Sequence, residues 1–282
     1  MIKLTRSDRL FPERLRAIFD PPRELYLRGG GAVELLGSRA VAVVGARSCS
    51  PYGAHVARML GRELASAGVV VVSGLARGID GEAHRGALEA SGVTAGVLGC
   101  GIDRDYPASN AILSRRIEEN GLVVSEYEPG VEPAPWRFPA RNRIIAGLCE
   151  GVVVVEARER SGALITADFA LEEGRDVFAV PGEITASLSA GTNALLKLGA
   201  IPMTSSNDVL DVLGVERPTA PEAVDVSPEA AKVLELVRDA PAGADELTAR
   251  GVLEAGTISV ALTELELAGL VAAADGVYRA AR

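Results

Sequence analysis

The 282-residue sequence is poor in the residues that most often carry out catalysis or bind metals. It contains two histidines, His55 and His84, and three cysteines, Cys49, Cys100 and Cys149, which lie far apart without metal-ligand spacing. It has no P-loop, nucleophile elbow, HExxH or CxxC motif. We therefore expect no metal and no cofactor, and we expect the thiols to be reduced, as in a cytoplasmic protein.

Long apolar runs are also absent. No apolar segment approaches the roughly 20 residues that a membrane-spanning helix needs. Residues 1–20 do not have the layout of a signal peptide. We expect a soluble, cytoplasmic protein without a membrane partner.

Lysine is rare: 26 of the 29 basic residues are arginine. The net charge of the chain is -9. A GC-rich genome is enough to explain the arginine bias, although the guanidinium fork also suits phosphate contacts. Negative net charge argues against a nucleic-acid partner, but the distribution of charge matters more than its sum. Residues 136–148 contain Arg137, Arg141 and Arg143 and no acidic side chain, so they form a local basic cluster.

The order of the apolar runs predicts an α/β fold. Strand-like runs alternate with helical patterns, which is typical of right-handed βαβ units and of a doubly wound, mostly parallel, Rossmann-like sheet. We assign residues 39–215 to this domain and residues 1–38 to a proline-punctuated N-terminal lead-in. The strand-like runs cover residues 41–44, 69–72, 93–99, 122–127, 151–157, 176–182 and 200–205.

A change of composition indicates a second, smaller domain. We interpret residues 216–227, which contain proline and show no helical pattern, as a linker. Residues 228–282 are predicted to form a winged-helix-like domain, because three helical stretches, 228–239, 245–250 and 256–268, precede two strand-like segments around Asp275-Gly276, a strong hairpin signal. Its last predicted helix, 256–268, has two glutamates and no lysine or arginine, so we expect it to contact protein rather than duplex DNA.

Two strand ends deliver glycine, small hydroxyl groups and arginine to one edge of the predicted sheet. GARSCSPYG follows the strand at 41–44, and SGLARG follows the strand at 69–72. Open α/β sheets bind ligands at this edge, and the free amides of helix N-termini there favour anions. Because GARSCSPYG lacks the GxGxxG spacing, we do not expect a dinucleotide.

Two more segments add to this predicted anion site. FPARNR, residues 138–143, combines Phe138, which can stack on a base, with Arg141 and Arg143, which can hold phosphates, as in proteins that bind single strands without reading sequence. Alternatively, Phe138 fills the core and the arginines form a solvated helix start. SGALIT, residues 161–166, places small polar groups at another helix N-terminus, which is also ordinary capping chemistry.

One pair of titratable residues leaves two interpretations open. Asp80 precedes His84 by four residues at the start of a predicted helix. The pair could form an orienting dyad. Alternatively, Asp80 caps its own helix and His84 packs beside it.

Seven sequence blocks together resemble the DNA processing protein A family, also called DprA or Smf. The resemblance covers about residues 10–214. It implies an extended Rossmann-like domain that binds single-stranded DNA and helps to load the RecA recombinase onto it, as in natural transformation, with no catalytic reaction. The blocks are, in order, VGARSCSPYG, SGLARGIDGEAHRGAL, GVLGCGIDRDYP, SEYEPG, FPARNRIIAGL, VVVVEARERSGALITADFALEEGRDVFAVPG and GTNALLKLGA.

The resemblance also implies where DNA and a second copy of the chain bind. An arginine at a turn contributes charge rather than core volume, so replacing Arg47 or Arg141 with alanine is expected to weaken DNA binding with little loss of stability. The implied DNA-binding residues are Arg47, Ser48, Ser73, Gly74, Arg77, Gly78, Phe138, Arg141, Asn142, Arg143, Ser161, Gly162 and Thr166. A homodimer is expected through Val209, Leu210, Val212 and Leu213, with packing of these residues on the sheet as the alternative.

An enzyme is the second functional hypothesis. Nucleoside-monophosphate phosphoribohydrolases of a related Rossmann family use a PGGxGT turn and a downstream glutamate. Here SGALITA occupies the comparable strand end without the double glycine, and Glu172 and Glu173 are the nearby glutamates. Release of free base from a nucleoside monophosphate would identify such an enzyme.

Overall fold

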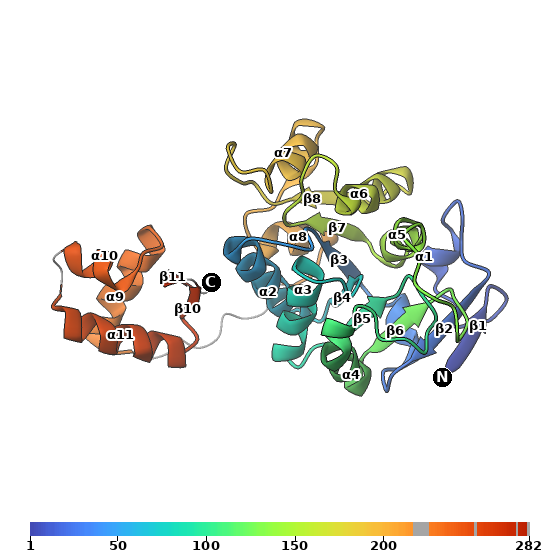
Figure 1. The fold of residues 1–282 in the computed structure, drawn as a ribbon, viewed down its shortest axis with the longest axis horizontal. Coiled ribbons are helices and arrows are strands. Elements are labelled where there is room, and N and C mark those ends of the chain that lie inside the picture. The colour runs from blue at the N-terminus through green and yellow to red at the C-terminus, as the bar shows by residue number, and fades with distance from the viewer. Residues whose placement is uncertain (217–225, 251–252, 275, 281–282) are drawn as a thin grey trace. The chain divides into compact units, whose positions relative to one another are not determined.

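The computed structural model divides the chain into two compact units, residues 1–218 and 219–282. The structure describes residues 1–216, 226–250, 253–274 and 276–280. Most of the predicted linker, residues 217–225, lies outside the described residues. Each unit has its own apolar core, so the two are described separately (Figure 1).

A nine-stranded sheet forms the centre of residues 1–218. The strand order is β1-β2-β6-β5-β4-β3-β7-β8-β9, and all neighbouring strands from β6 to β9 are parallel. This arrangement confirms the predicted doubly wound α/β fold. The strands are β1 (Ile2–Thr5), β2 (Glu24–Arg28), β3 (Ala40–Val44), β4 (Val70–Ser73), β5 (Thr94–Val97), β6 (Leu122–Ser125), β7 (Gly151–Val154), β8 (Asp176–Ala179) and β9 (Ile201–Pro202).

Helices cover both faces of this sheet, as the near-continuous valine runs of the central strands require. The cores place α1, α5, α6 and α7 on one face and α2, α3, α4 and α8 on the other (Figure 1). No helix in the described part of the chain is long and apolar enough to cross a membrane. The helices are α1 (Glu13–Arg16), α2 (Pro51–Ser66), α3 (Ile79–Glu89), α4 (Ala111–Asn120), α5 (Arg137–Leu148), α6 (Gly162–Glu172), α7 (Ala190–Lys197) and α8 (Ser206–Leu213), with short 3-10 helices η1 (Val33–Gly37) and η2 (Ala108–Asn110).

The N-terminal segment contributes more to the sheet than its sequence predicts. β2 pairs antiparallel with β6, and β1 pairs antiparallel with β2. Leu25 and Leu27 are fully buried on one face of the sheet, and Tyr26 is buried on the other. Residues 1–38 therefore provide two strands of the sheet itself.

Residues 226–280 form three helices followed by a two-stranded hairpin. α9 (Pro228–Asp239), α10 (Ala244–Ala249) and α11 (Ala255–Leu267) lie within two residues of the predicted bounds, and β10 (Val271–Ala274) pairs with β11 (Val277–Ala280). Asp275 of the predicted turn lies outside the described residues. Inward-facing residues of all three helices, among them Val233, Leu247 and Ile258, are fully buried in a separate core.

Candidate functional site

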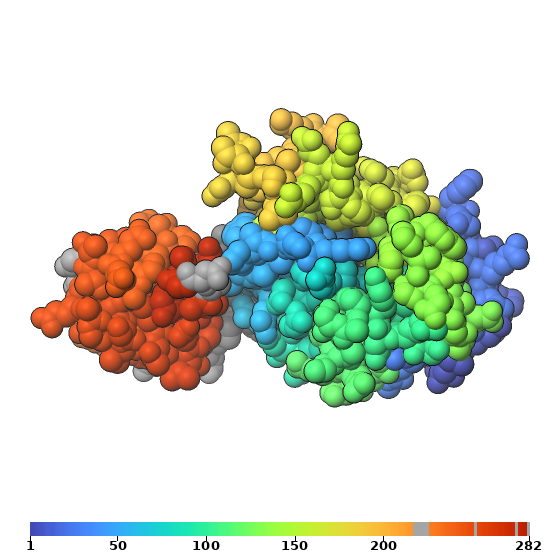
Figure 2. All heavy atoms as spheres, viewed as in Figure 1, coloured from blue at the N-terminus to red at the C-terminus, as the bar shows by residue number. Residues whose placement is uncertain are grey.

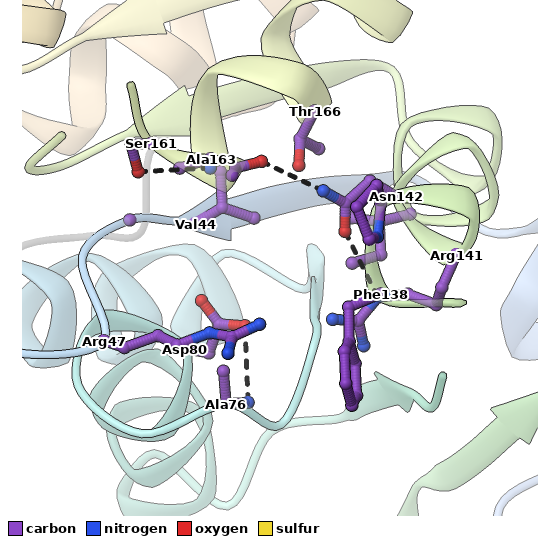
Figure 3. Close-up of a pocket in the computed structure, with 14 residues that line it drawn as sticks. Val44, Arg47, Ala76, Asp80, Phe138, Arg141, Asn142, Ser161, Ala163 and Thr166 are labelled. Atoms are coloured by element: carbon purple, nitrogen blue, oxygen red, sulfur yellow. Dashed lines mark hydrogen bonds between the residues drawn. The ribbon is translucent and has the colours of Figure 1, made fainter. Parts of the chain in front are cut away.

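The segments that follow β3, β4 and β5 and the starts of α5 and α6 surround two adjoining cavities. Their volumes are about 220 and about 280 Å³. Figure 2 shows the blue, green and yellow-green segments that meet here on the surface of this unit, and Figure 3 shows the smaller cavity. Arg47, Ala76, Phe138 and Arg141 line both cavities. The residues that line only the smaller cavity include Gly45, Asp80, Asn142, Ser161, Gly162 and Thr166. Those that line only the larger cavity include Gly74, Arg77 and Tyr106.

A buried glutamate fixes the turn that presents Arg47. Glu156 follows the end of β7. Its main-chain oxygen accepts a hydrogen bond from the Ala46 amide (2.8 Å), and its carboxylate accepts one from the Ser50 amide (2.9 Å). Glycine at position 45 lets this turn pack closely on α3, because a Cβ atom there would lie only 2.7 Å from the Ile79 side chain. Arg47 is exposed, and no carboxylate of the described residues lies within ion-pair distance of it. Its charge is therefore available to an anion.

Two aromatic rings lie beside this arginine. The guanidinium carbon of Arg47 is 5.4 Å from the ring centroid of Phe138, a cation–π contact. The ring of Tyr106 stacks on Phe138, with centroids 5.2 Å apart and an interplanar angle of 23°. Phe138 is half-buried and lines both cavities, so it does not simply fill the core. Arginine next to aromatic rings is a combination that suits a nucleic-acid strand.

Arg141 differs from Arg47 because its guanidinium is buried. It donates hydrogen bonds to the carbonyl oxygens of Gly74 (2.8 Å) and Val97. Burial lowers the pKa of Arg141 to about 10, which leaves it protonated at neutral pH. The expectation that Arg141 contributes charge rather than structure is therefore wrong, because the side chain joins the ends of two strands.

Asp80 supplies the opposite charge at the floor of the smaller cavity. Its carboxylate accepts hydrogen bonds from the amides of Gly74 (3.1 Å) and Ala76 (3.4 Å), and burial raises its pKa. Gly74 is needed between the two charged groups, since a Cβ there would lie 2.5 Å from Arg141 and 2.7 Å from Asp80. Figure 3 shows Arg47 and Asp80 facing Phe138 and Arg141 across the cavity.

The start of α6 forms the third wall of the smaller cavity. Ser161 caps the helix by accepting a hydrogen bond from the Ala163 amide (3.3 Å), and Asn142 donates to the Gly162 carbonyl (3.0 Å). Thr166 is almost fully buried, and its hydroxyl points into the cavity (Figure 3). The predicted capping role of Ser161 is confirmed. The free amides at this helix start favour a bound anion.

Several predicted DNA-binding residues have structural partners. Ser73 is fully buried and donates to the Val43 carbonyl (2.7 Å). Arg143 pairs with Asp20 (2.9 Å) and Glu126 (2.7 Å), so its charge is already neutralised inside the protein. These contacts make Ser73 and Arg143 supports of the site rather than surface groups.

The remaining predicted positions lie around the turns. Arg77 is exposed at the rim of the larger cavity. Ser48 is exposed and is not among the cavity-lining residues. Gly78 has a φ of +74°, and a Cβ there would lie 2.3 Å from the Ala46 carbonyl oxygen, so it lets the second turn pack against the first.

Three residues beside the cavities were not predicted from the sequence. Tyr106 lies in the third of the family blocks, GVLGCGIDRDYP, and only the fold brings its ring to Phe138. Arg158 and Arg160 are exposed on the turn between β7 and α6, directly before Ser161. Their position after a buried strand is the signal that could have identified them.

The Asp80–His84 dyad does not form. The Nδ1 atom of His84 is 2.6 Å from the hydroxyl of Thr94, and Asp80 binds the amides of the preceding turn. His84 is fully buried, and burial lowers its pKa to about 3. The alternative is confirmed in part: His84 packs inside, whereas Asp80 holds the loop before the helix.

The glutamates of the enzyme hypothesis lie at the wrong end of α6. Glu172 ends this 11-residue helix, and Glu173 accepts a hydrogen bond from the Phe19 amide (2.8 Å). A helix of this length is about 16 Å long, and the cavity lies at its other end. Neither glutamate is placed to act on a ligand in the cavity.

The predicted dimer residues divide into two pairs. Val209 and Leu210 are buried in the core of their own chain, between α8 and the sheet, so they are not surface groups. Val212 is 44% exposed, and Leu213 is partly buried. Only the second pair is available to another copy.

The chain matches two family models and several known proteins. A family model described as DNA recombination-mediator protein A matches residues 3–214, and one for the DprA winged helix domain matches residues 217–276. The chain is 49% identical over 209 residues to DNA processing protein DprA of Streptococcus pneumoniae (72% of this chain, 71% of that protein). It is 42% identical over 279 residues to Protein Smf of Escherichia coli (95% of this chain, 74% of that protein).

Two solved structures are also similar. The X-ray structure of S. pneumoniae DprA has a TM-score of 0.71 and 47% identity, covering 74% of this chain and 73% of that one. A Helicobacter pylori DNA processing protein A, described for its single-stranded DNA binding mode, has a TM-score of 0.67 and 33% identity, covering 75% and 95%. The chain therefore belongs to the DNA recombination-mediator protein A family, the DprA or Smf proteins.

Proposed function

We propose that this chain binds single-stranded DNA in the two cavities and presents it to the RecA recombinase, as in natural transformation. One observation carries the proposal. Arg47, which has no ion-pair partner among the described residues, lies against the Phe138–Tyr106 stack at the carboxyl edge of the parallel sheet. The binding mode described for the H. pylori relative supports the same ligand.

The geometry favours a single strand over a duplex. Aromatic rings can stack only on bases that are not already stacked in a double helix, and unpaired cations attract the phosphates between those bases. The helix that would enter a DNA groove in a winged-helix domain, α11, contains no lysine or arginine. Duplex binding through that helix therefore has no electrostatic support.

The proposed binding partners are RecA and a second copy of the chain. The proposed location is the cytoplasm, in which RecA acts. The role needs no chemical reaction, since the cavity would only hold a strand in place. For self-association we propose the exposed edge of α8, with Val212 and Leu213, because Val209 and Leu210 already fill the core. A monomer in light scattering at high protein concentration would contradict the dimer.

Replacing Arg47 tests the proposed site. We expect Arg47→Ala to weaken binding of a labelled single-stranded oligonucleotide roughly tenfold or more, because a charge-assisted phosphate contact contributes about 1.5–3 kcal/mol. Fluorescence anisotropy measures the affinity. Arg116→Ala, which removes an equally exposed arginine from α4, is the control and should bind normally.

The outcome of this comparison is unambiguous if both variants melt like the parent protein. Normal binding by a folded Arg47→Ala variant would place the DNA elsewhere. Equal losses in both variants would mean that only net charge matters. Release of free base from a nucleoside monophosphate would support the phosphoribohydrolase alternative instead.

A further inference from the structure

Phe138, which the sequence singles out as the base-stacking residue, already has neighbours around its ring. Tyr106 stacks on it at 5.2 Å, and Arg47 lies 5.4 Å from its centroid. The ring also packs over Gly99, where a Cβ would lie 2.9 Å from the Phe138 Cδ1 atom. A base would have to displace one of these groups to stack on Phe138.

Tyr106 is the more accessible ring of the pair. It is 41% exposed and lines only the larger cavity, beside Pro107 and Ser109. Phe138 supports it from behind. An aromatic ring that is stacked on one side and open to solvent elsewhere is a platform on which another planar group can extend the stack.

The segment that carries Tyr106 is fixed to the rest of the site. Asn110, buried at the end of η2, donates hydrogen bonds to the carbonyl oxygens of Leu75 (2.9 Å) and Ala76 (3.0 Å). These residues directly precede Arg77. The Tyr106 ring and the Arg77 side chain therefore lie on segments that are tied to each other, so DNA binding does not have to pay the conformational entropy of ordering a free loop.

The lining of the larger cavity suits a nucleobase and its phosphate. Gly74 and Gly99 contribute backbone to its lining and let the Arg141 and Phe138 side chains pack against them. Arg47 and Arg77 lie at its border, and neither has an ion-pair partner among the described residues. The cavity has no acidic side chain in its lining, so phosphates next to the base would not be repelled.

We propose that the larger cavity is a nucleobase subsite in which a base of the bound strand stacks on the exposed face of Tyr106, while Phe138 supports this ring. The proposal rests on the proposed function, because the base belongs to the same single strand. It assigns the two aromatic residues different parts: Tyr106 contacts DNA, and Phe138 positions Tyr106. Stacking on a ring depends little on base identity, so the subsite accepts any base.

The test compares a base-bearing with a base-free strand. Tyr106→Leu removes the ring and keeps an apolar side chain. Its affinity for oligo(dT) should fall roughly tenfold, in line with loss of one base stack. Its affinity for an abasic oligonucleotide of the same length should equal that of the parent protein. Tyr106→Phe should bind both strands normally.

Tyr52→Ala is the matched control. Tyr52 is 42% exposed, lies in the first turn of α2 and is not among the cavity-lining residues. A second measurement uses an oligonucleotide that contains 2-aminopurine. Stacking on Tyr106 should quench its fluorescence on binding, and Tyr106→Leu should abolish the quenching whereas Tyr52→Ala should not.

Each outcome separates the subsite from the function on which it rests. If the parent protein binds single strands but Tyr106→Leu binds oligo(dT) equally well, the subsite is wrong and the proposed function stands. Equal losses for oligo(dT) and the abasic strand would show that Tyr106 acts only on the shape of the loop, which also overturns the subsite. If the parent protein binds no single strand, both proposals fail.

Discussion

At the scale of single residues, two arginines with similar sequence contexts have opposite roles. Arg47 is exposed on a turn and contacts the Phe138 ring, whereas Arg141 is buried and binds two strand-end carbonyls. Both are in the family's blocks. The sequence identifies them as part of one site, but only the structure separates the side chain that can meet DNA from the one that supports the turns.

We expect Arg141→Ala to destabilise the protein strongly. The substitution leaves Asp80 buried without its neighbouring positive charge and two carbonyls without a donor, which together should lower the free energy of unfolding by about 3–5 kcal/mol. Thermal or urea unfolding measures the change. Arg47→Ala should remain within about 0.5 kcal/mol of the parent protein. An Arg141→Ala variant that melts normally would contradict the assigned role.

Residue types at the site were predictable, but their exposure was not. Strand-end turns with glycine and arginine indicated the edge of the sheet at which the cavities lie, and Arg47, Phe138, Asn142 and Thr166 meet there. Tyr106 could not be predicted, because its stacking partner is 32 positions away and the fold alone joins them. The ion pairs of Arg143 likewise depend on distant residues, Asp20 of the lead-in and Glu126 directly after β6.

At the scale of elements, the valine-rich strands were predictable and the two N-terminal strands were not. Valine-rich runs identified β3, β4 and β7, which are buried on both faces and therefore continuously apolar. β1 and β2 lack such a run and are separated by a proline-containing segment, and β2 joins the sheet by pairing with β6. Contacts far apart in sequence decide such strands.

The packing of α3 on β5 predicts a dependence of stability on pH. His84 of α3 is neutral when folded, with a pKa of about 3, and has an ordinary pKa of 6.5 when unfolded. Its contribution to stability is thus fully present above about pH 6.5 and is lost as the pH falls from there toward 3. Between pH 7 and pH 5, we expect it to remove about 2 kcal/mol from the free energy of unfolding.

Denaturant unfolding of the parent protein and of His84→Gln at several pH values measures this effect. The variant is expected to show a smaller loss of stability between pH 7 and pH 5, whatever its stability at pH 7. His55 remains in both proteins and contributes equally. The same pH slope in both proteins would show that His84 does not titrate as assigned.

At the scale of the whole molecule, the chain consists of two units with separate cores and different charge. All residues that line the two cavities lie between Val44 and Thr166, within the first unit. In residues 219–282 acidic side chains outnumber basic ones. We therefore expect DNA binding not to require the second unit. We expect the second unit to contact protein instead, during RecA handover or self-association.

Removing residues 219–282 should leave single-strand affinity within about twofold, because no cavity residue and no free cation of the site is lost. Anisotropy titration measures the affinity, and circular dichroism shows whether residues 1–218 remain folded. A tenfold loss, about 1.4 kcal/mol, in a folded truncated protein would make the second unit part of the DNA site.

We propose that the chain binds single strands through a few arginine–phosphate contacts and base stacking. Titration of labelled single-stranded and duplex oligonucleotides over a range of salt concentrations tests this directly. We expect a clear preference for the single strand. We also expect that log affinity falls with log salt concentration by about 0.7 for each phosphate that is neutralised. Equal affinity for the duplex, or affinity that does not change with salt, would contradict this proposal.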